Sequence, residues 1–460
     1  MSKNTDKKKN VLKVAMITAF MTTFMGSALN LSIPDLESYY QVGGTFVGWI
    51  ITIYNLTVAS ISVPMGKLAD IIGRKKVFVT GILGFLISSV LCSLSFNIWI
   101  LLVARIFQGI SSAMIFSTNN AILISSFDVK RRGEVLGYST AATYIGLSVG
   151  PVIGGWLNYY FNWQSIFVSS SIIAFACLVL AIRNVDENKS YENKCELNLD
   201  KKGNILYVLM ISLSLYGLTS ITSSKYGWLL MILGILFAII FVKTEINEDN
   251  PLIKIEMFSK DRNFTLSNLA ALLNYGATFA ISYLVSLYLQ LVMGFDSHKA
   301  GLLLICMPLV QAIFSPIMGK LSDKIPPARL ATQGMILCVI ALLIFTRLNE
   351  TTPLWYVVLG LLVAGFGFAL FSSPNTNAIM ECVKEKDYGV TNSIIATMRN
   401  YGQTASMSIV SIVMGIYVGN SQLEVVSTNQ LITTFRTIFY IFTVLCLLAV
   451  FMSMKRKIKN

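Results

Sequence analysis

Two arginines, Arg105 and Arg399, lie inside long apolar runs of this sequence, and no Asp or Glu lies in the interior of any such run. A cation within a membrane span costs roughly 2.5–3.5 kcal/mol on insertion scales, so each guanidinium needs water, a hydrogen-bond acceptor or an anion. Such a group can hold an anionic molecule or bias a nearby proton-binding group. A simpler role, hydrogen bonding to backbone carbonyls, is also open to Arg105. The nearest carboxylates lie near the ends of the runs: Asp35, Glu37, Asp70, Asp128, Glu134, Asp323 and Glu381.

Neutral polar side chains in the apolar runs form a second set of candidates. Most are expected to make hydrogen bonds between helices, and roughly a third to face a substrate cavity. The set comprises Asn30, Asn55, Gln108, Asn119, Asn120, Tyr144, Asn274, Tyr275, Asn375 and Asn377. The only histidine, His298, lies in a polar segment, which excludes a multi-histidine metal site, and no cofactor is implied.

Composition indicates the environment in which these residues act. Of the 460 residues, 55% are hydrophobic and only 13% are charged, against roughly 25% charged in soluble domains. A soluble domain cannot bury so much apolar surface, so we expect an all-α integral membrane protein in a lipid bilayer. The net charge of +13 sits in short clusters between apolar runs. That is typical of cytoplasmic loops, and we expect no nucleic-acid partner.

Fourteen apolar segments are long enough to be transmembrane helices. Placing the N-terminus in the cytoplasm puts 30 of the 36 Lys and Arg on the cytoplasmic side and all six Trp at outer ends of spans. Both patterns are typical of membrane proteins and predict that both termini are cytoplasmic. The predicted spans are 11–33, 46–66, 76–95, 98–122, 134–157, 164–183, 203–222, 227–243, 263–291, 300–319, 329–347, 354–378, 389–417 and 431–454.

The chain repeats itself. P-M-G-K-L-A-D at 64–70 returns as P-I-M-G-K-L-S-D at 316–323, and T-N-N-A-I at 118–122 returns as N-T-N-A-I at 375–379. Duplicated halves around a central site are a transporter design. We therefore predict the following organisation: a basic tail at 1–10, a six-helix bundle at 11–183, a linker with two extra spans at 184–262, a second six-helix bundle at 263–454 and a basic tail at 455–460.

The segment G-K-L-A-D-I-I-G-R-K-K, from Gly66 to Lys76, is the sharpest local motif. Its glycines permit a tight turn and close helix approach, and its charges can pair or meet helix ends at the membrane surface. We predict a conformational latch, with Pro326 and Pro327 weakening the second copy where the first has Gly and Arg. The latch residues are Gly66, Asp70, Gly73, Arg74, Asp128, Gly319 and Asp323. The motif resembles the signature loop between the second and third spans of the major facilitator superfamily.

The fifth predicted span contains G-L-S-V-G-P-V-I-G-G. Gly146, Gly150 and Gly154 share one helix face, on which a neighbouring backbone can approach closely, and Pro151 permits a kink. Together with Gly155, this ordered motif resembles the fifth-span motif of the superfamily's antiporters, which are mostly exporters.

Fourteen spans, N-L-S-I-P at 30–34, R-I-F-Q-G at 105–109 and R-N-Y-G at 399–402 narrow the resemblance. The chain is similar to the fourteen-span drug:proton antiporters, which include tetracycline and multidrug exporters. The resemblance implies two six-helix bundles plus a two-helix insertion, and associates Arg105 with proton coupling. Family members often carry a carboxylate where this chain has Met25. Three readings stay open: protons handled by Asp70, Arg74 and Asp128, a cavity for neutral, zwitterionic or anionic substrates, or no proton coupling.

These observations predict a secondary transporter in the cytoplasmic membrane of a bacterium, with protons and a small molecule as partners. Proton-coupled efflux of amphipathic drugs is the first expectation. Export of an anionic or lipid-like metabolite, with Arg105 and Arg399 as counter-ions, is the alternative. A membrane-embedded enzyme would need a nucleophile, acid–base or metal constellation at a membrane face, which this chain does not offer.

Overall fold

The computed structural model describes residues 2–42, 44–185, 200–221, 225–295, 297–418 and 427–456. Its regular elements are all helical, and ten helical stretches are long and apolar enough to cross a membrane. Four further long helices occupy the remaining predicted spans: α1 (Ser2–Ser27), α6 (Arg132–Phe161), α8 (Lys201–Thr219) and α17 (Tyr388–Tyr417). All four pack against other helices of the seam or core, and their sequences carry Gly, Ser, Thr and Asn among the apolar residues.

The first half of the chain forms one group of helices around its own apolar core. Besides α1 and α6, this half holds α3 (Gly44–Ile72), α4 (Arg74–Ser93), α5 (Ile98–Ser126) and α7 (Gln164–Asn184), with the short elements η1 (Ala28–Ser32), α2 (Ile33–Tyr40) and η2 (Val129–Arg131). The predicted span 11–33 was wrong at its end, because α1 stops at Ser27 and the chain turns through η1 into α2. Pro34 explains the break, since proline is tolerated in the first turn of α2 but not within a continuous helix.

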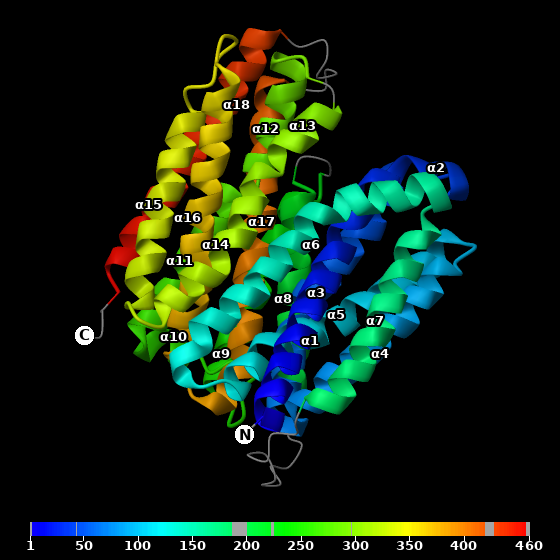
Figure 1. Cartoon of the computed structure of the whole chain (residues 1–460), viewed down its shortest axis with the longest axis vertical. Coiled ribbons are helices and arrows are strands. Elements are labelled where there is room, and N and C mark those ends of the chain that lie inside the picture. Colours follow the sequence, from blue (N-terminus) through cyan, green and yellow to red (C-terminus); the bar gives the residue numbers. More distant parts are fainter. Residues whose placement is uncertain are drawn as a thin grey trace.

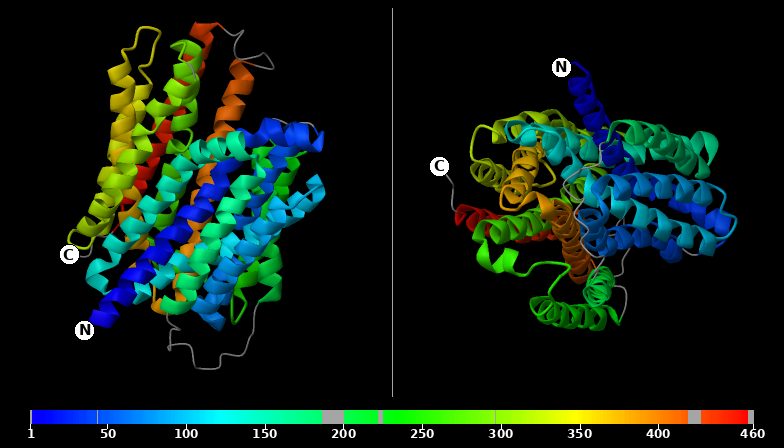
Figure 2. Two further views of the ribbon diagram at one scale, coloured as in Figure 1. Left: turned by 45° about the vertical axis from the view of Figure 1, so that its right-hand side comes forward. Right: turned by 90° about the horizontal axis from the view of Figure 1, so that it is seen from below.

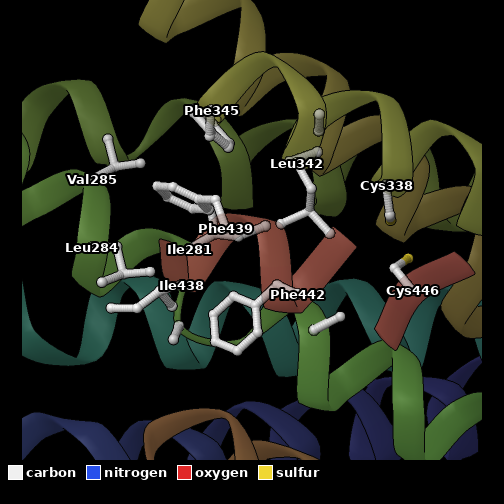
Figure 3. Close-up of a cluster of buried hydrophobic side chains, with 14 of the residues drawn as sticks. Ile281, Leu284, Val285, Cys338, Leu342, Phe345, Ile438, Phe439, Phe442 and Cys446 are labelled. Atoms are coloured by element: carbon white, nitrogen blue, oxygen red, sulfur yellow. The ribbon is translucent and has the colours of Figure 1, made fainter. Parts of the chain in front are cut away.

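The second half forms a matching group around a separate core, part of which is drawn in Figure 3. There, side chains of α12 (Ile281–Leu287), α15 (Pro327–Phe345) and α18 (Thr428–Met454) interdigitate. Its remaining elements are α10 (Glu256–Lys260), α11 (Arg262–Thr278), the short π-helix η4 (Tyr288–Val292), α13 (Ser297–Leu304), α14 (Cys306–Ser322), α16 (Leu354–Met380), η5 (Glu385–Asp387) and α17.

The two halves meet mainly along two helix pairs, α3 with α17 and α6 with α14, and α5 with α17 and α6 with α16 add further contacts. Both chain ends lie near one face of the molecule, which we call the termini face, and the halves diverge away from it (Figure 1). The inserted hairpin of α8 and α9 (Gly227–Ile246) packs through α8 against α3 and α17, so it covers one of these seams (Figure 2).

Candidate functional site

The first latch joins α3 to the N-terminus of α17 at the termini face. The Asp70 carboxylate accepts hydrogen bonds from the backbone amides of Gly389 at 3.1 Å and Val390 at 3.0 Å. Arg74 forms a buried ion pair with the same carboxylate at 3.1 Å and donates to the Glu385 carbonyl. A carboxylate at a helix N-terminus is stabilised by the helix dipole, so these contacts hold the two halves together.

The second latch repeats this geometry between α14 and α6. The Asp323 carboxylate accepts from the backbone amides of Gly133 at 2.6 Å and Glu134 at 2.9 Å. A Cβ on Gly319 would overlap the backbone of Gly133, just as one on Gly66 would stand 2.6 Å from the Gly389 carbonyl oxygen. The repeat seen in the sequence is therefore a repeat of inter-half contacts.

Two other predicted latch residues have different surroundings. Gly73 adopts a φ of +106° ahead of α4, a turn conformation that favours glycine. Asp128 is 80% exposed and forms an ion pair with Lys8, at 3.7 Å. An exposed pair of this kind contributes little, so the geometry gives Asp128 no part in the Asp70 contacts.

A cavity of about 370 Å³ lies between the halves, farther from the termini face than the latches. It is lined by α1, α3, α5, α6, α8 and α17, and no carboxylate lines it among the described residues. The polar lining residues are Thr22, Thr23, Ser27, Thr52, Tyr54, Asn55, Tyr216, Thr219, Arg399, Asn400, Gln403 and Thr404.

A smaller cavity of about 60 Å³ adjoins the first on the side of the latches and shares Phe116 and Arg399 with it. Hydrogen bonds between the halves and within the second half surround it. Asn120 of α5 donates to Asn392 of α17 at 2.8 Å. Tyr144 of α6 and Tyr275 of α11 both contact the Ser372 hydroxyl, at 3.2 and 3.3 Å. These contacts and the two latches lie between the large cavity and the termini face.

Arg399 is the charged side chain of both cavities. Its guanidinium lies over the Phe116 ring, 5.4 Å from the centroid, and it is half-buried. None of the ion pairs formed by the described residues involves it. A partly desolvated guanidinium without a carboxylate partner can bind an oxyanion through two parallel hydrogen bonds.

Arg105 lines neither cavity. It is fully buried inside the first half, where it donates to the Ile50 carbonyl at 2.9 Å and to Gln108 at 2.7 Å. Its guanidinium also lies 4.3 Å from the centroid of Tyr54, a residue that lines the large cavity. These bonds lie within the first half, as in the simpler role weighed for this arginine, and its Nη2 atom is buried without a hydrogen-bond partner.

The predicted cavity residues divide into two groups. The structure brings Asn55, Asn119, Asn120, Tyr144 and Tyr275 to the cavities. Four others lie outside both: Gln108 bonds Ser89, Asn274 contacts Cys446, Asn375 accepts from Arg456, and Asn377 donates to Ser322. These four make hydrogen bonds inside a bundle or beside a latch, which was the other role expected of such residues. The side chain of Asn30 lies outside the described residues.

The glycine motif of α6 packs against α1 and η1. A Cβ on Gly146 would stand 2.6 Å from the Phe20 carbonyl oxygen, and Cβ atoms on Gly150 and Gly154 would overlap Ser27 and Ala28. Pro151 lies within α6, and Gly155 is half-buried away from this contact. Two small-residue surfaces thus bring the α1 and α6 backbones together beside the cavity.

Several lining residues were not predicted from the sequence. Asn400 and Gln403 follow Arg399 on α17, and Tyr216 comes from the inserted hairpin. The spacing of Gln403, one helical turn after Arg399, was a usable signal. Tyr216 had none, because only the packing of α8 on the seam brings it to the cavity.

The family model for the Major Facilitator Superfamily matches residues 15–244 and 268–458, which include both latches and both cavities. The chain belongs to this superfamily. It is therefore a multi-pass membrane transporter of small molecules and not an enzyme. The human organic anion transporter MFSD10 has the same fold, with a TM-score of 0.72 over 97% of this chain and 99% of that one, at 15% identity.

Relatives in this superfamily carry different names. The riboflavin transporter RibZ of Clostridioides difficile is 30% identical over 399 residues, covering 85% of this chain and 84% of that protein. The multidrug transporter MdtP of Bacillus subtilis is 25% identical, over 91% of this chain and 78% of its own. The multidrug resistance protein Stp of Mycobacterium tuberculosis is also 25% identical, over 86% and 74%. The all-helical major facilitator fold expected from the sequence is thus confirmed.

Proposed function

We propose that this transporter exports amphipathic organic molecules that are neutral or anionic, by alternating access around the cavity at Arg399. The observation that carries the proposal is the charge of that cavity: one guanidinium and no carboxylate among the described lining residues. An unpaired guanidinium attracts an oxyanion and repels a cation. Of the two arginines first considered as counter-ions, the proposal therefore uses only Arg399.

The walls of the cavity favour a substrate with a flat ring. Phe116 and Tyr54 line the large cavity, and Tyr144 and Tyr275 line the small one. Aromatic faces stack on planar rings, while the amides of Asn55, Asn400 and Gln403 offer hydrogen bonds to its polar edges. The similarity to a protein named for riboflavin, a planar heterocycle, supports this class of substrate.

The proposal includes the orientation and the moving parts. Most Lys and Arg lie at the termini face in the predicted topology, so we take it as the cytoplasmic face. Both latches are closed there, which makes the structure an outward-facing state. The units that rock are the bundles at 11–183 and 263–454, with 184–262 as linker, along the α3–α17 and α6–α14 seams.

Export driven by inward proton movement is the direction and energy source we propose. The antiporter-like glycine motif of α6 and the similarity to multidrug transporters support it. Asp70 and Asp323 are the carboxylates placed to exchange protons as the latches open. Each proton that moves inward gains roughly 2.3 kcal/mol per 100 mV.

The test compares two flavins that differ by one phosphate. The full chain is reconstituted in liposomes with an internal pH dye, and riboflavin, its phosphate ester and the cation ethidium are offered in turn under a pH gradient. We expect transport of both flavins with proton movement, and little transport of ethidium. Charge-assisted hydrogen bonds contribute about 1.5–3 kcal/mol. Arg399→Gln should therefore lower the transport of the ester relative to riboflavin about ten- to a hundredfold.

Arg347→Gln is the matched control, because it removes the same charge from an exposed position outside the cavity. It should leave the ratio of the two flavins unchanged. An unchanged ratio in Arg399→Gln, or a preference of the wild-type chain for ethidium, would refute the proposed substrate class. Flavin transport without proton movement would refute the coupling alone.

A further inference from the structure

Two carboxylic side chains meet at the termini-face end of the inserted hairpin. Asp200 caps α8, accepting from the Gly203 amide at 2.8 Å, and Glu245 lies in the last turn of α9. The second oxygen of Glu245 accepts from the Ile253 amide at 2.9 Å. Both side chains are buried, with 9% of Asp200 and 2% of Glu245 exposed. Neither residue belongs to the latches or to the cavities.

One oxygen of each carboxyl group, Oδ2 of Asp200 and Oε1 of Glu245, is buried without a hydrogen-bond partner. A Cβ on Gly203 would overlap both of these oxygens, because both lie very close to the same point. The two oxygens are therefore no more than about 4 Å apart. Two carboxylates facing each other in a buried site cannot both be ionised at low cost, whereas one shared proton turns the repulsion into a hydrogen bond. The geometry thus fits a pair that holds one proton.

We propose that Asp200 and Glu245 form a binding site for a single proton, through which cytoplasmic pH controls the α3–α17 latch. The sensing of cytoplasmic pH rests on the proposed orientation, while the proton site itself does not. With the proton bound, the start of α8 and the end of α9 are held together. When the proton leaves, the two charges repel and the end of the hairpin loosens.

The segment from 247 to 255 connects this pair to the latch. Glu245 fixes the Ile253 amide, and the Leu252 and Ile253 side chains are buried in one apolar cluster with Val63 of α3 and Val390 of α17. Val390 is also a residue whose amide binds Asp70. Loosening of the segment therefore removes side-chain packing around Val390, the residue whose amide binds Asp70 in the latch.

Charged side chains of the neighbouring elements fix the same segment. Lys67 of α3 donates to the Pro251 carbonyl at 2.9 Å, and Lys254 pairs with Asp387 of η5 at 2.8 Å. Lys67 is also within electrostatic reach of Asp70, Asp387 and Glu245. Lys254 is balanced by Asp387, and Asp70 is balanced by Arg74, so Lys67 adds a positive charge near the carboxyl pair. That charge favours ionisation, whereas burial and the repulsion within the pair favour the bound proton.

Infrared spectroscopy of the full chain in liposomes detects the shared proton directly, as a carboxylic-acid C=O band that disappears as pH rises. We expect this band in the wild-type chain and its loss in Glu245→Gln. Asp200→Asn is the second variant, because asparagine caps a helix as well as aspartate does and should keep the fold. Glu256→Gln is the matched control, since that carboxyl is 74% exposed on nearby α10 and should not change the band.

Hydrogen exchange of the 247–255 segment reads the connection to the latch. After correction for the effect of pH on the intrinsic exchange rate, protection in the wild-type chain should fall about tenfold as the band disappears. A tenfold change corresponds to a difference of one pKa unit in the carboxyl pair between the fixed and the loosened segment. Glu245→Gln should abolish that pH dependence. A band that persists in both pair variants, or protection that does not follow it in the wild-type chain, would overturn the proposal. Neither readout needs a substrate, so failure of the proposed function would leave this test intact.

Discussion

Alanine in place of Gly319 is expected to open the α6–α14 latch. A Cβ at this position would stand 3.0 Å from the Gly137 Cα and from the Gly133 carbonyl carbon, and nearer still to the Gly133 carbonyl oxygen. All three atoms are backbone atoms, so no side-chain rotation relieves the overlap and the two helices must separate. Overpacking of this kind costs about 1–3 kcal/mol. The closed state alone bears that cost, so the equilibrium constant for closing should fall about 5- to 150-fold.

Hydrogen exchange at the first turn of α6 measures the effect. The amides of Gly133 and Glu134 are bound to Asp323 only while the latch is closed, so their protection reports the closed fraction. Replacing glycine by alanine also favours the helix by up to about 1 kcal/mol, but it does so in both states. Gly301→Ala is the matched control, because nothing lies within 4 Å of a Cβ there.

Two results would contradict this reasoning. Protection at α6 that is unchanged in Gly319→Ala would mean that the close helix approach does not determine closing. An equal loss of protection in Gly301→Ala would mean that helix propensity, and not overlap at the seam, causes the change. The exchange of α17 at Gly389 serves as an internal reference, since the first latch is untouched by either variant.

Three further predictions concern single polar groups. Burial raises the pKa of Asp323 in spite of its two amide bonds. The closed latch therefore binds a proton at Asp323 more tightly than the open latch does. As pH rises from the usual aspartate range through the raised pKa of Asp323, the closed latch loses stability, and protection of the α6 amides from hydrogen exchange should fall. Asp323→Asn should remove this pH dependence of protection. Arg105→Ala leaves the acceptors at Ile50 and Gln108 without their donor. The free energy of unfolding should fall by about 1.5–3 kcal/mol per charged hydrogen bond, which lowers the melting temperature. The transport ratio of the two flavins should not change. Arg456, whose pKa burial lowers to about 10, remains charged at neutral pH, and Arg456→Gln should likewise destabilise the chain in a thermal melt while flavin transport at low temperature persists.

The positions of the helices follow from local sequence, because a bilayer requires a continuous apolar helix wherever the chain crosses it. The predicted span at 98–122 became α5 at Ile98–Ser126, and the span at 389–417 became α17 at Tyr388–Tyr417. The end predicted for the first span, at residue 33, was wrong because hydropathy does not detect the turn at Pro34. The latch contacts were predictable in part, since the repeated Gly and Asp residues indicated the helix that supplies the carboxylate of each latch. The partner amides on α6 and α17 carry no side-chain signal at all.

The cavity was harder to predict than the fold. Asn120 and Asn377 occupy the same place in the repeated motifs, yet Asn120 lines the small cavity while Asn377 donates to Ser322 beside a latch. Helix rotation decides between these roles, and it depends on packing with distant segments. Glu245 shows the same limit, because it lies beyond the predicted end of its span at 243 and becomes buried only through the fold of the loop that follows.

The two latches repeat each other in backbone geometry but differ in what supports them. At Asp70, Arg74 adds an ion pair and a bond to Glu385, and the hairpin packs beneath the amide of Val390. At Asp323, Pro326 and Pro327 follow where the first copy has Gly and Arg, and no arginine pairs with Asp323 among the described residues. The Asp323 latch therefore has fewer charged contacts to lose on separation than the Asp70 latch. The extent of helix packing is the reverse, because α6 and α14 contact each other more extensively than α3 and α17 do. The two seams thus differ in what holds them: charged contacts and the inserted hairpin at α3–α17, and close helix packing at α6–α14.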